Sequence, residues 1–393
     1  MLFDGVRVLD LSRMLAGPYG SMLLADLGAE VFKIEEPAGG DPMRAMGPPF
    51  LDGESAYFLA INRNKKSLTL DLERTEGREV FYDLVRVADV VWDNFRPGIM
   101  ERLRCDYPTI RQYNEKIIVC SLSAYGQEGP YRDWPAFDLA LQAMGGAMSL
   151  TGEEGRPPLR MGLPMGDLAG GLFGALAVAG ALYRRDRTGQ GCQVDLSLLD
   201  CQVSLLTYFA QFFWADGRVP GPVGSGHPSV VPYQAFRTRD GHLAVAVFSE
   251  KFWVAFCRAL GRLDLAADPR FTSNARRVEH RAELLPILEA LLAEKGTEEW
   301  LAVLRAEGVP VAPIQRVDQV LSDPQVLLRG MVAELPHPKL GRIPTLGVPI
   351  RPSGESRPLA PPPALGEHTE GILTGLLGYP VERIRRLRDA KVI

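Results

Sequence analysis

Residues 6–35 read VRVLDLSRMLAGPYGSMLLADLGAEVFKIE, and this stretch predicts the fold of the first part of the chain. A strand is expected over 6–11, a turn over 16–20, a helix over 21–27 and a second strand over 30–35. These elements make a βαβ unit, which begins a parallel sheet with helices on its faces. Such sheets bind ligands at the carboxyl ends of their strands. The fingerprint G-x-G-x-x-G is absent, so a dinucleotide is not indicated.

The alternation of strand and helix continues to about residue 215, which is typical of a doubly wound α/β fold. Asp138 is expected to cap a helix that passes through residues 141–143. Further strands are expected over residues 68–72, 89–93, 116–122 and 193–197, and a long apolar helix over 198–213.

The composition of the chain changes near residue 215. Residues 217–229 are rich in glycine and proline, which is typical of an interdomain linker and equally of a mobile loop whose N–H groups stabilise an oxyanion. A hairpin is expected over 233–247, and the helices that follow it indicate a smaller α+β domain. We therefore expect a large domain over 1–215, a small domain with its preceding linker over 216–320, and a C-terminal segment over 321–393.

The overall composition is that of a soluble globular enzyme. The chain has 393 residues, of which 46% are hydrophobic and 23% charged, and its net charge of −4 argues against a nucleic-acid partner. Because the sequence opens on a strand pattern, we expect no signal peptide, and no segment is expected to be long enough to span a membrane. The scattered cysteines and histidines lack metal-ligand spacing. We expect free thiols in a reducing compartment, the cytoplasm, and a site without a metal.

One carboxylate stands out from the rest of the chain. Asp167 lies in Pro164–Gly171, between glycines and just before a run of small apolar residues, 168–183, that predicts a buried helix. The simple interpretation is a helix N-cap, because aspartate is favoured there. The alternative is that Asp167 is an ionised nucleophile. The glycines would let a ligand approach it closely, and the helix dipole would stabilise its negative charge.

Several cations lie near the predicted strand ends. Each of them alone is typical of a solvated surface charge, but as a group they are placed to meet the phosphates of an anionic ligand. They are Arg63, Lys65, Lys66, Arg96 and Arg102.

Five stretches carry a family signal: Leu9–Pro18, Leu24–Glu35, Asn62–Ser67, Asn94–Gly98 and Gly366–Thr369. Together they resemble the motifs of class III CoA-transferases, the superfamily of formyl-CoA transferase, carnitine–crotonobetaine CoA-transferase and methylacyl-CoA racemase. The resemblance covers essentially the whole chain.

The resemblance implies a fold, a nucleophile and a ligand. The family has a Rossmann-like large domain, a smaller domain and a C-terminus that returns to the large one, and two chains interlock as a homodimer. Its catalytic aspartate precedes a glycine-rich helix, and Asp167 matches it. Coenzyme A enters as a substrate, carried as an acyl-CoA. The family's CoA contacts match Ala16, Leu70, Asp71, Leu72, Glu73, Asn94, Phe95, Arg96, Arg102, Ala136 and Phe137.

Two other functions are weighed against a transferase. The racemases of the family use a His–Asp pair to move an α-proton, and Phe137 stands where that histidine would be, so one base is missing. The formyl-CoA and oxalate type has a glutamine where this chain has Leu15. The other alternative is a non-catalytic CoA-binding protein, against which the intact Asp167 argues.

Two further stretches, Met46–Phe50 and Ser225–Phe236, resemble the branch of the family that uses succinyl-CoA and dicarboxylates. The resemblance therefore implies transfer of CoA from succinyl-CoA to an acid such as glutarate. The loop of Gly224, Ser225 and Gly226 is a candidate oxyanion donor. His227 and Arg13 are candidate partners for the distal carboxylate of the acid.

Overall fold

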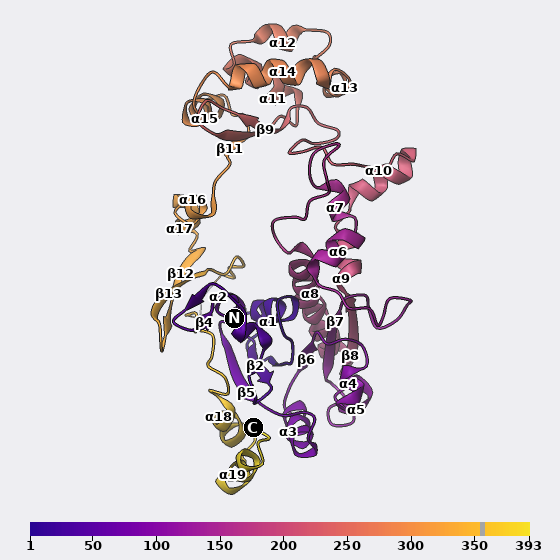
Figure 1. Ribbon diagram of the computed structural model, residues 1–393, viewed down its shortest axis with the longest axis vertical. Coiled ribbons are helices and arrows are strands. Elements are labelled where there is room, and N and C mark those ends of the chain that lie inside the picture. Colours follow the sequence, from indigo (N-terminus) through magenta and orange to yellow (C-terminus); the bar gives the residue numbers. More distant parts are fainter. Residues whose placement is uncertain (354–357) are drawn as a thin grey trace. The chain divides into compact units, whose positions relative to one another are not determined.

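The computed structural model describes residues 1–353 and 358–393, so residues 354–357 of the predicted C-terminal segment lie outside the described part (Figure 1). The chain divides into two compact units. Unit 1 comprises residues 1–147, 160–217 and 327–393, and unit 2 comprises residues 148–159 and 218–326. Residues 148–159, which the sequence places in the large domain, therefore group with unit 2.

Unit 1 is built on a parallel six-stranded sheet. Its strand order is β5-β2-β1-β6-β7-β8, which is the doubly wound order 3-2-1-4-5-6 when the six strands are numbered along the chain. The strands are β1 (Arg7–Asp10), β2 (Glu30–Glu35), β5 (Lys65–Thr69), β6 (Val90–Asp93), β7 (Ile118–Ser123) and β8 (Cys192–Ser197). The predicted α/β class with a parallel sheet is confirmed.

Helices cover both faces of this sheet, because successive residues of each buried strand point to opposite sides. Val8 packs in a cluster with helices α1 and α8, whereas its neighbour Leu9 packs in a cluster with α3, α18 and α19. The helices of unit 1 are α1 (Ala16–Asp26), α2 (Ala56–Ile61), α3 (Thr75–Val85), α4 (Ile99–Arg102), α5 (Tyr107–Ile110), α6 (Asp138–Met144), α8 (Met165–Thr188), α9 (Leu198–Ser204), α10 (Tyr208–Asp216), α18 (Thr369–Gly375) and α19 (Val381–Asp389), with a 3₁₀ helix at Pro42–Ala45.

The C-terminal residues of the chain pack against the sheet of unit 1. The N–H of Asp71 donates to the carbonyl of Val392, and Thr69 is hydrogen-bonded to Thr369. The two short hairpins of this unit are β3 (Phe50–Leu51) with β4 (Glu54–Ser55), and β12 (Val332–His337) with β13 (Gly341–Leu346).

Unit 2 has its own core around a three-stranded antiparallel sheet, in the order β11-β10-β9. The predicted hairpin is present as β9 and β10. The elements of unit 2 are β9 (Tyr233–Arg237), β10 (His242–Ala246), α11 (Glu250–Ala259), α12 (Leu263–Ala267), α13 (Asn274–Glu279), α14 (Arg281–Leu292), α15 (Thr297–Ala306), β11 (Val311–Pro313) and α16 (Val317–Val320). Two more helices, α7 (Ala147–Leu150) and α17 (Pro324–Leu328), lie where the chain passes between units.

Three element predictions are wrong in their bounds. The turn expected at 16–20 is the start of α1, because Pro18 is tolerated in the first helical turn. The helix expected over 198–213 is broken into α9 and α10 at Thr207, which has φ 44°. The strand expected at 68–72 is β5, which begins and ends three residues earlier than predicted.

The fourth correction concerns α8. Its 24 residues make it the one helix in the described part of the chain that is long and apolar enough to cross a membrane, contrary to the sequence expectation. Length and composition alone are weak evidence, since the core helix of a soluble protein passes the same test. Here α8 packs against α1 and against strands β7 and β8.

Candidate active site

The strand order of unit 1 reverses direction between β1 and β6, and two cavities lie at the carboxyl ends of these strands. The first has a volume of about 260 Å³ and contains Asp167 in its wall. The second has about 500 Å³. Both are lined by Met14, Asn94, Phe95 and Arg96, so they share a wall. A doubly wound sheet places its ligand crevice at this reversal point.

The loop after β1 forms part of that shared wall. Asn94 holds it from the neighbouring strand end, because its side chain accepts from the N–H of Arg13 (2.8 Å) and donates to the Arg13 carbonyl (2.7 Å). Met14 has φ 67°, a left-handed conformation that is uncommon for a residue with a side chain. Backbone of this kind is concentrated at functional sites, where the surroundings hold it in place.

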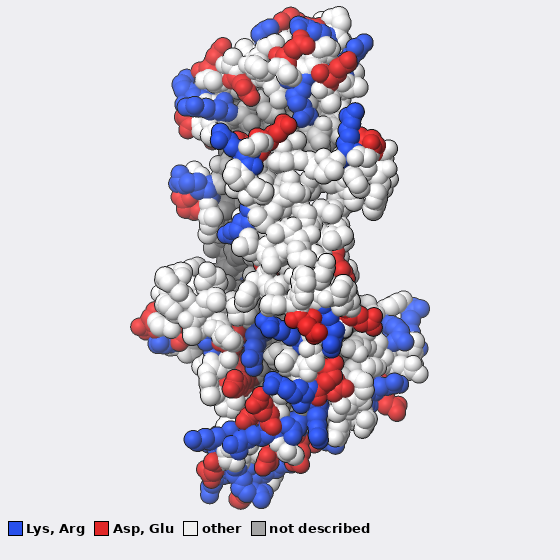
Figure 2. All heavy atoms as spheres, turned by 45° about the vertical axis from the view of Figure 1, so that its right-hand side comes forward, with Lys and Arg blue, Asp and Glu red and all other residues white. Residues whose placement is uncertain are grey.

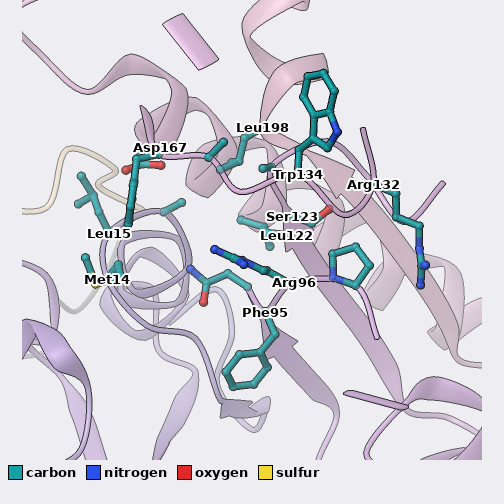
Figure 3. A pocket seen from close by; sticks show the side chains of 16 residues that line it. Met14, Leu15, Phe95, Arg96, Leu122, Ser123, Arg132, Trp134, Asp167 and Leu198 are labelled. Atoms are coloured by element: carbon teal, nitrogen blue, oxygen red, sulfur yellow. The ribbon is translucent and has the colours of Figure 1, made fainter. Parts of the chain in front are cut away.

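Arg96 is an exposed cation at the cavity that contains Asp167. Figure 3 shows its side chain extending into this cavity, with the Asp167 carboxylate beside Leu15. A guanidinium in such a position can pair with phosphate or carboxylate oxygens of a ligand. Trp134 and Arg132, which the sequence reading did not single out, lie on another side of the same cavity (Figure 3).

Asp167 lies in the first turn of α8 and does not cap it. The helix begins at Met165, its N-cap is Pro164, and no side chain of the N-cap residue accepts a hydrogen bond. The capping interpretation of Asp167 is therefore wrong. The carboxylate of Asp138 accepts hydrogen bonds from the start of α8 instead, since its Oδ1 accepts from the N–H groups of Gly166 (2.9 Å) and Asp167 (3.3 Å).

Asp138 also differs from its predicted role. It is the first residue of α6, and that helix has no side-chain cap. Its Oδ2 accepts from Nε2 of Gln142 (2.6 Å), and Oε1 of Gln142 accepts from the N–H of Met161 (2.8 Å). Asp138 and Gln142 therefore brace the segment that leads into α8. Their spacing of four residues on one helix face was the available signal, but sequence does not show what that face contacts.

The charge state of Asp167 is set by its surroundings. Burial, with a smaller contribution from the nearby charge of Asp138, raises its pKa to about 7. The sequence predicts that the helix dipole favours the ionised form of Asp167. The effects of burial and of the Asp138 charge on the pKa are larger than that of the dipole. Near neutral pH the ionised and the protonated forms of Asp167 are therefore comparably populated, and a shift of this kind is common among residues at functional sites.

The predicted CoA contacts all line one of the two cavities. Met14 and Asn94 to Arg96 belong to both. The cavity with Asp167 is lined by Ala16, Ala136 and Phe137, and the larger cavity by Leu70, Asp71, Leu72, Glu73 and Arg102. Arg13 lines the larger cavity and does not line the cavity of Asp167. Its guanidinium lies over the ring of Phe95.

Three of the predicted phosphate-binding cations are engaged elsewhere. Arg63 pairs with Asp26 at 2.6 Å, Lys65 with Asp10 at 3.0 Å and Lys66 with Glu30 at 2.7 Å. Arg63 and Lys65 are buried as well, so a ligand phosphate has no access to them. Arg96 and Arg102 remain beside the cavities, and Arg102 approaches Glu73 across 3.6 Å at an exposed position.

The glycine-rich loop belongs to unit 2 and is described there alone. The N–H of Gly224 donates to the carbonyl of Gly152 (2.8 Å), and that of Gly226 donates to the carbonyl of Val223 (3.0 Å). The hydroxyl of Ser225 accepts from the N–H of Ala235. Two of the predicted oxyanion donors are therefore occupied in this conformation. Nδ1 of His227 accepts from the N–H of Ser229, and burial together with Arg281 lowers the pKa of this histidine.

Across residues 1–353 and 358–393, no three His, Cys, Asp or Glu side chains are grouped as they would be around a metal ion.

Comparison with known proteins shows what this chain is similar to. The model of CoA-transferase family III matches residues 3–369. The succinyl-CoA:glutarate CoA-transferase of Mus musculus is 40% identical over 391 residues, covering 99% of this chain and 90% of that protein. The succinate–glutarate CoA-transferase of Agrobacterium fabrum is 37% identical, covering 95% of each chain. The crystal structure of a CAIB/BAIF family protein from Brucella suis superposes with a TM-score of 0.84 at 38% identity, over 95% of this chain and 98% of that one.

Proposed function

This chain belongs to CoA-transferase family III and is therefore an enzyme, and we propose that it moves CoA from succinyl-CoA to a dicarboxylic acid such as glutarate, with Asp167 as the nucleophile. The observation that carries the proposal is the position of Asp167 in the wall of a cavity that shares a wall with a second, larger one. An extended acyl-CoA fits this arrangement, with its thioester at Asp167 and its nucleotide end towards Leu70–Glu73.

The first half of the proposed reaction loads CoA onto the enzyme. An ionised oxygen of Asp167 attacks the thioester carbonyl, the C–S bond breaks, and an acyl–aspartyl anhydride and CoA thiolate are formed. The thiolate then attacks the side-chain carbonyl of Asp167. This step forms an aspartyl-CoA thioester and releases succinate, and no proton is transferred.

The second half repeats these steps with the other acid. The acceptor carboxylate attacks the aspartyl thioester, which gives a second anhydride and releases CoA thiolate. The thiolate attacks the acyl carbonyl of the acceptor, so the new acyl-CoA leaves and Asp167 is regenerated as a carboxylate. Keeping CoA in covalent form preserves the energy of the thioester, provided that water is excluded.

The relatives support the proposed substrate class, and Arg96 is a candidate partner for a carboxylate of the acid. The mouse and Agrobacterium relatives are named for glutarate together with succinyl-CoA or succinate. Arg96 extends into the cavity of Asp167 and is placed to pair with a distal carboxylate or a CoA phosphate (Figure 3). Arg13 lines the larger cavity, so we assign it to the CoA side of the site. Residues Gly224–His227 of unit 2 stay predicted partners for the acid.

Mass spectrometry of products tests the proposal directly. The protein is mixed with succinyl-CoA and a panel of mono- and dicarboxylic acids, with Asp167→Ala as the control. New acyl-CoAs with dicarboxylates, absent in the variant, support it. If none of the acids accepts CoA, the donor or the transferase assignment to this site is wrong. Solvent deuterium entering the α-carbon of a 2-methylacyl-CoA would instead favour racemisation, for which Phe137 offers no base.

We also propose that the chain works as a homodimer. The exposed side of α8 carries Leu172, Leu176 and Tyr183, and α10 carries Trp214, all with most or about half of their surface accessible. Figure 2 shows charged side chains gathered at the lower end of unit 1 and an almost uncharged area above them. Such apolar surface is typical of an interface. Light scattering should give the mass of two chains, and a monomer would contradict the proposal.

The place of action is proposed from the thiols. The five cysteines are free, and burial raises the pKa of Cys105, Cys120, Cys201 and Cys257. Free thiols suit a reducing compartment such as the cytoplasm. Fractionation of the source cells tests this.

A further inference from the structure

Two buried ammonium groups donate hydrogen bonds to the backbone at the two ends of the loop between β1 and α1. Nζ of Lys33 donates to the carbonyl of Ser12 (2.9 Å) at the start of the loop, and Nζ of Lys65 donates to the carbonyl of Pro18 (2.9 Å) just past its end. The two lysines come from neighbouring strands, β2 and β5. We call them the lysine clamp.

Each ammonium group is paired with a buried carboxylate. Lys33 contacts Asp41 at 2.8 Å, and Lys65 contacts Asp10 at 3.0 Å and the amide oxygen of Asn62 at 2.9 Å. The side chains of both lysines are fully buried and those of Asp10 and Asp41 nearly so. All three donors of Lys65 are thereby used.

The same carboxylates hold the loop backbone as well. Oδ1 of Asp10 accepts from the N–H of Ser12 (2.9 Å), and Oδ1 of Asp41 accepts from the N–H of Met14 (3.2 Å). The left-handed backbone of Met14 is therefore kept in place by a charged network beneath it.

Stability alone does not explain such a network. Taking charged groups out of water is costly, and a buried ion pair is often no more stable than apolar residues of the same size. What the network supplies is a set of directed hydrogen bonds to one loop. That loop provides Met14, Leu15 and Ala16 to the cavity of Asp167, and Arg13 with Met14 to the larger cavity.

We propose that Lys33 and Lys65 are positioning residues for acyl-CoA, which hold the segment Ser12–Pro18, the loop and the first turn of α1, in the shape that the bound thioester requires. The inference rests on the proposed function of the site. Neither lysine touches the substrate, and both act through the carbonyls of Ser12 and Pro18.

The test removes one pair of charges at a time. Lys65→Met combined with Asp10→Asn leaves no unpaired buried charge, and Asn keeps an acceptor for the Ser12 N–H. The matched control is Lys66→Met, the next residue on β5, whose side chain is 46% exposed and pairs with Glu30 at the surface. Thermal unfolding, the Kd of CoA by titration calorimetry, and KM and kcat with succinyl-CoA are measured for each.

We expect the double variant to fold, to bind CoA about tenfold more weakly and to show a similar rise in KM, while Lys66→Met stays within twofold of wild type. Wild-type CoA affinity and KM in the folded double variant would overturn the proposal. If that variant does not fold, Lys33→Gln with Asp41→Asn applies the same test to the other lysine. Failure of both to fold overturns it too, because the lysines would then serve the fold itself.

The calorimetric measurement also separates this inference from the proposed function. If the wild-type protein binds CoA but transfers none from succinyl-CoA, the proposed donor fails. The effect of the lysine clamp on the Kd of CoA is still read in the same experiment.

Discussion

The backbone N–H of Asp167 lies 3.3 Å from Oδ1 of Asp138, so a carboxylate from α6 sits at the N-terminus of α8 beside the candidate nucleophile. The same oxygen accepts from Gly166 at 2.9 Å. Asp138 thus fixes the position of Asp167 through the backbone and raises its pKa through charge. The two effects can be separated by experiment.

Replacing the charge of Asp138 should shift the pH profile of the reaction. The nucleophile must be ionised, and the pKa of Asp167 is about 7, so kcat/KM should rise with pH and level off above 7. Asp138→Asn keeps an acceptor for the α8 backbone but removes the like charge, so the midpoint should move down by about one unit. Asp389→Asn, at an exposed position near the C-terminus of α19 and outside both cavities, is the control. An unchanged midpoint in Asp138→Asn would mean that burial alone raises the pKa.

Removing the carboxylate of Asp167, the proposed nucleophile, should stabilise the protein at alkaline pH. A carboxyl whose pKa is raised on folding binds its proton more tightly in the folded state, so stability falls as pH rises from about 4 to about 7. Asp167→Asn escapes this loss. We expect its free energy of unfolding to exceed that of wild type by up to about 4 kcal/mol at pH 8 and to match it at pH 4. Denaturant titrations at the two pH values measure this, and equal gains at both would contradict the assignment.

Arg96 should matter for binding more than for folding. Its side chain extends into the cavity of Asp167 and is exposed, so Arg96→Ala removes a cation without leaving a buried group unpaired (Figure 3). Loss of a charge-assisted hydrogen bond is worth about 1.5–3 kcal/mol, which predicts a rise in KM for succinyl-CoA of about 10- to 100-fold. Arg187→Ala, at the far end of α8, is the control and should leave KM unchanged. A fall in kcat without a rise in KM would point to a role in the chemical step.

Two glycines of α8 should respond in opposite ways to alanine. A Cβ on Gly171 would lie 2.8 Å from the carbonyl oxygen of Ala16, where α8 meets α1, so Gly171→Ala should destabilise by about 1–3 kcal/mol. A Cβ on Gly180 meets nothing within 4 Å, so Gly180→Ala should stabilise by about 0.5–1 kcal/mol. Denaturant titration compares them. Equal effects would mean that α1 and α8 do not approach as closely as described.

Local patterns were enough to predict a parallel sheet with helices on its faces, whereas the order of the strands came only from the structure. Apolar residues on consecutive positions, as in Val8 and Leu9, mark a strand buried on both faces, and the βαβ rhythm places the strand ends at one edge. The family motifs then pointed to Asp167 and to the residues that line both cavities. The break at Thr207 was missed because apolar periodicity continues across it.

Charged residues were predicted less well, because a side chain's role depends on what faces it. Lys65 and Lys66 are adjacent and chemically identical, yet one is buried against Asp10 and the other pairs with Glu30 at the surface. The alternation of a strand says only that they point to opposite faces. Which face holds a carboxylate is a property of the neighbouring strands and loops.

The sequence by itself therefore determined the α/β class, the family and the position of the candidate nucleophile, since these depend on periodicity and on motifs that are local in the chain. Only the tertiary structure decided that the carboxylate of Asp138, and not that of Asp167, accepts hydrogen bonds from the first turn of α8, and that Lys33 and Lys65 donate to the carbonyls at the two ends of the loop that lines the site. Those roles depend on burial and on contacts between segments that are distant in sequence. Burial changes the free energy of each charged group, and the size of this change cannot be predicted from the neighbouring residues in the sequence.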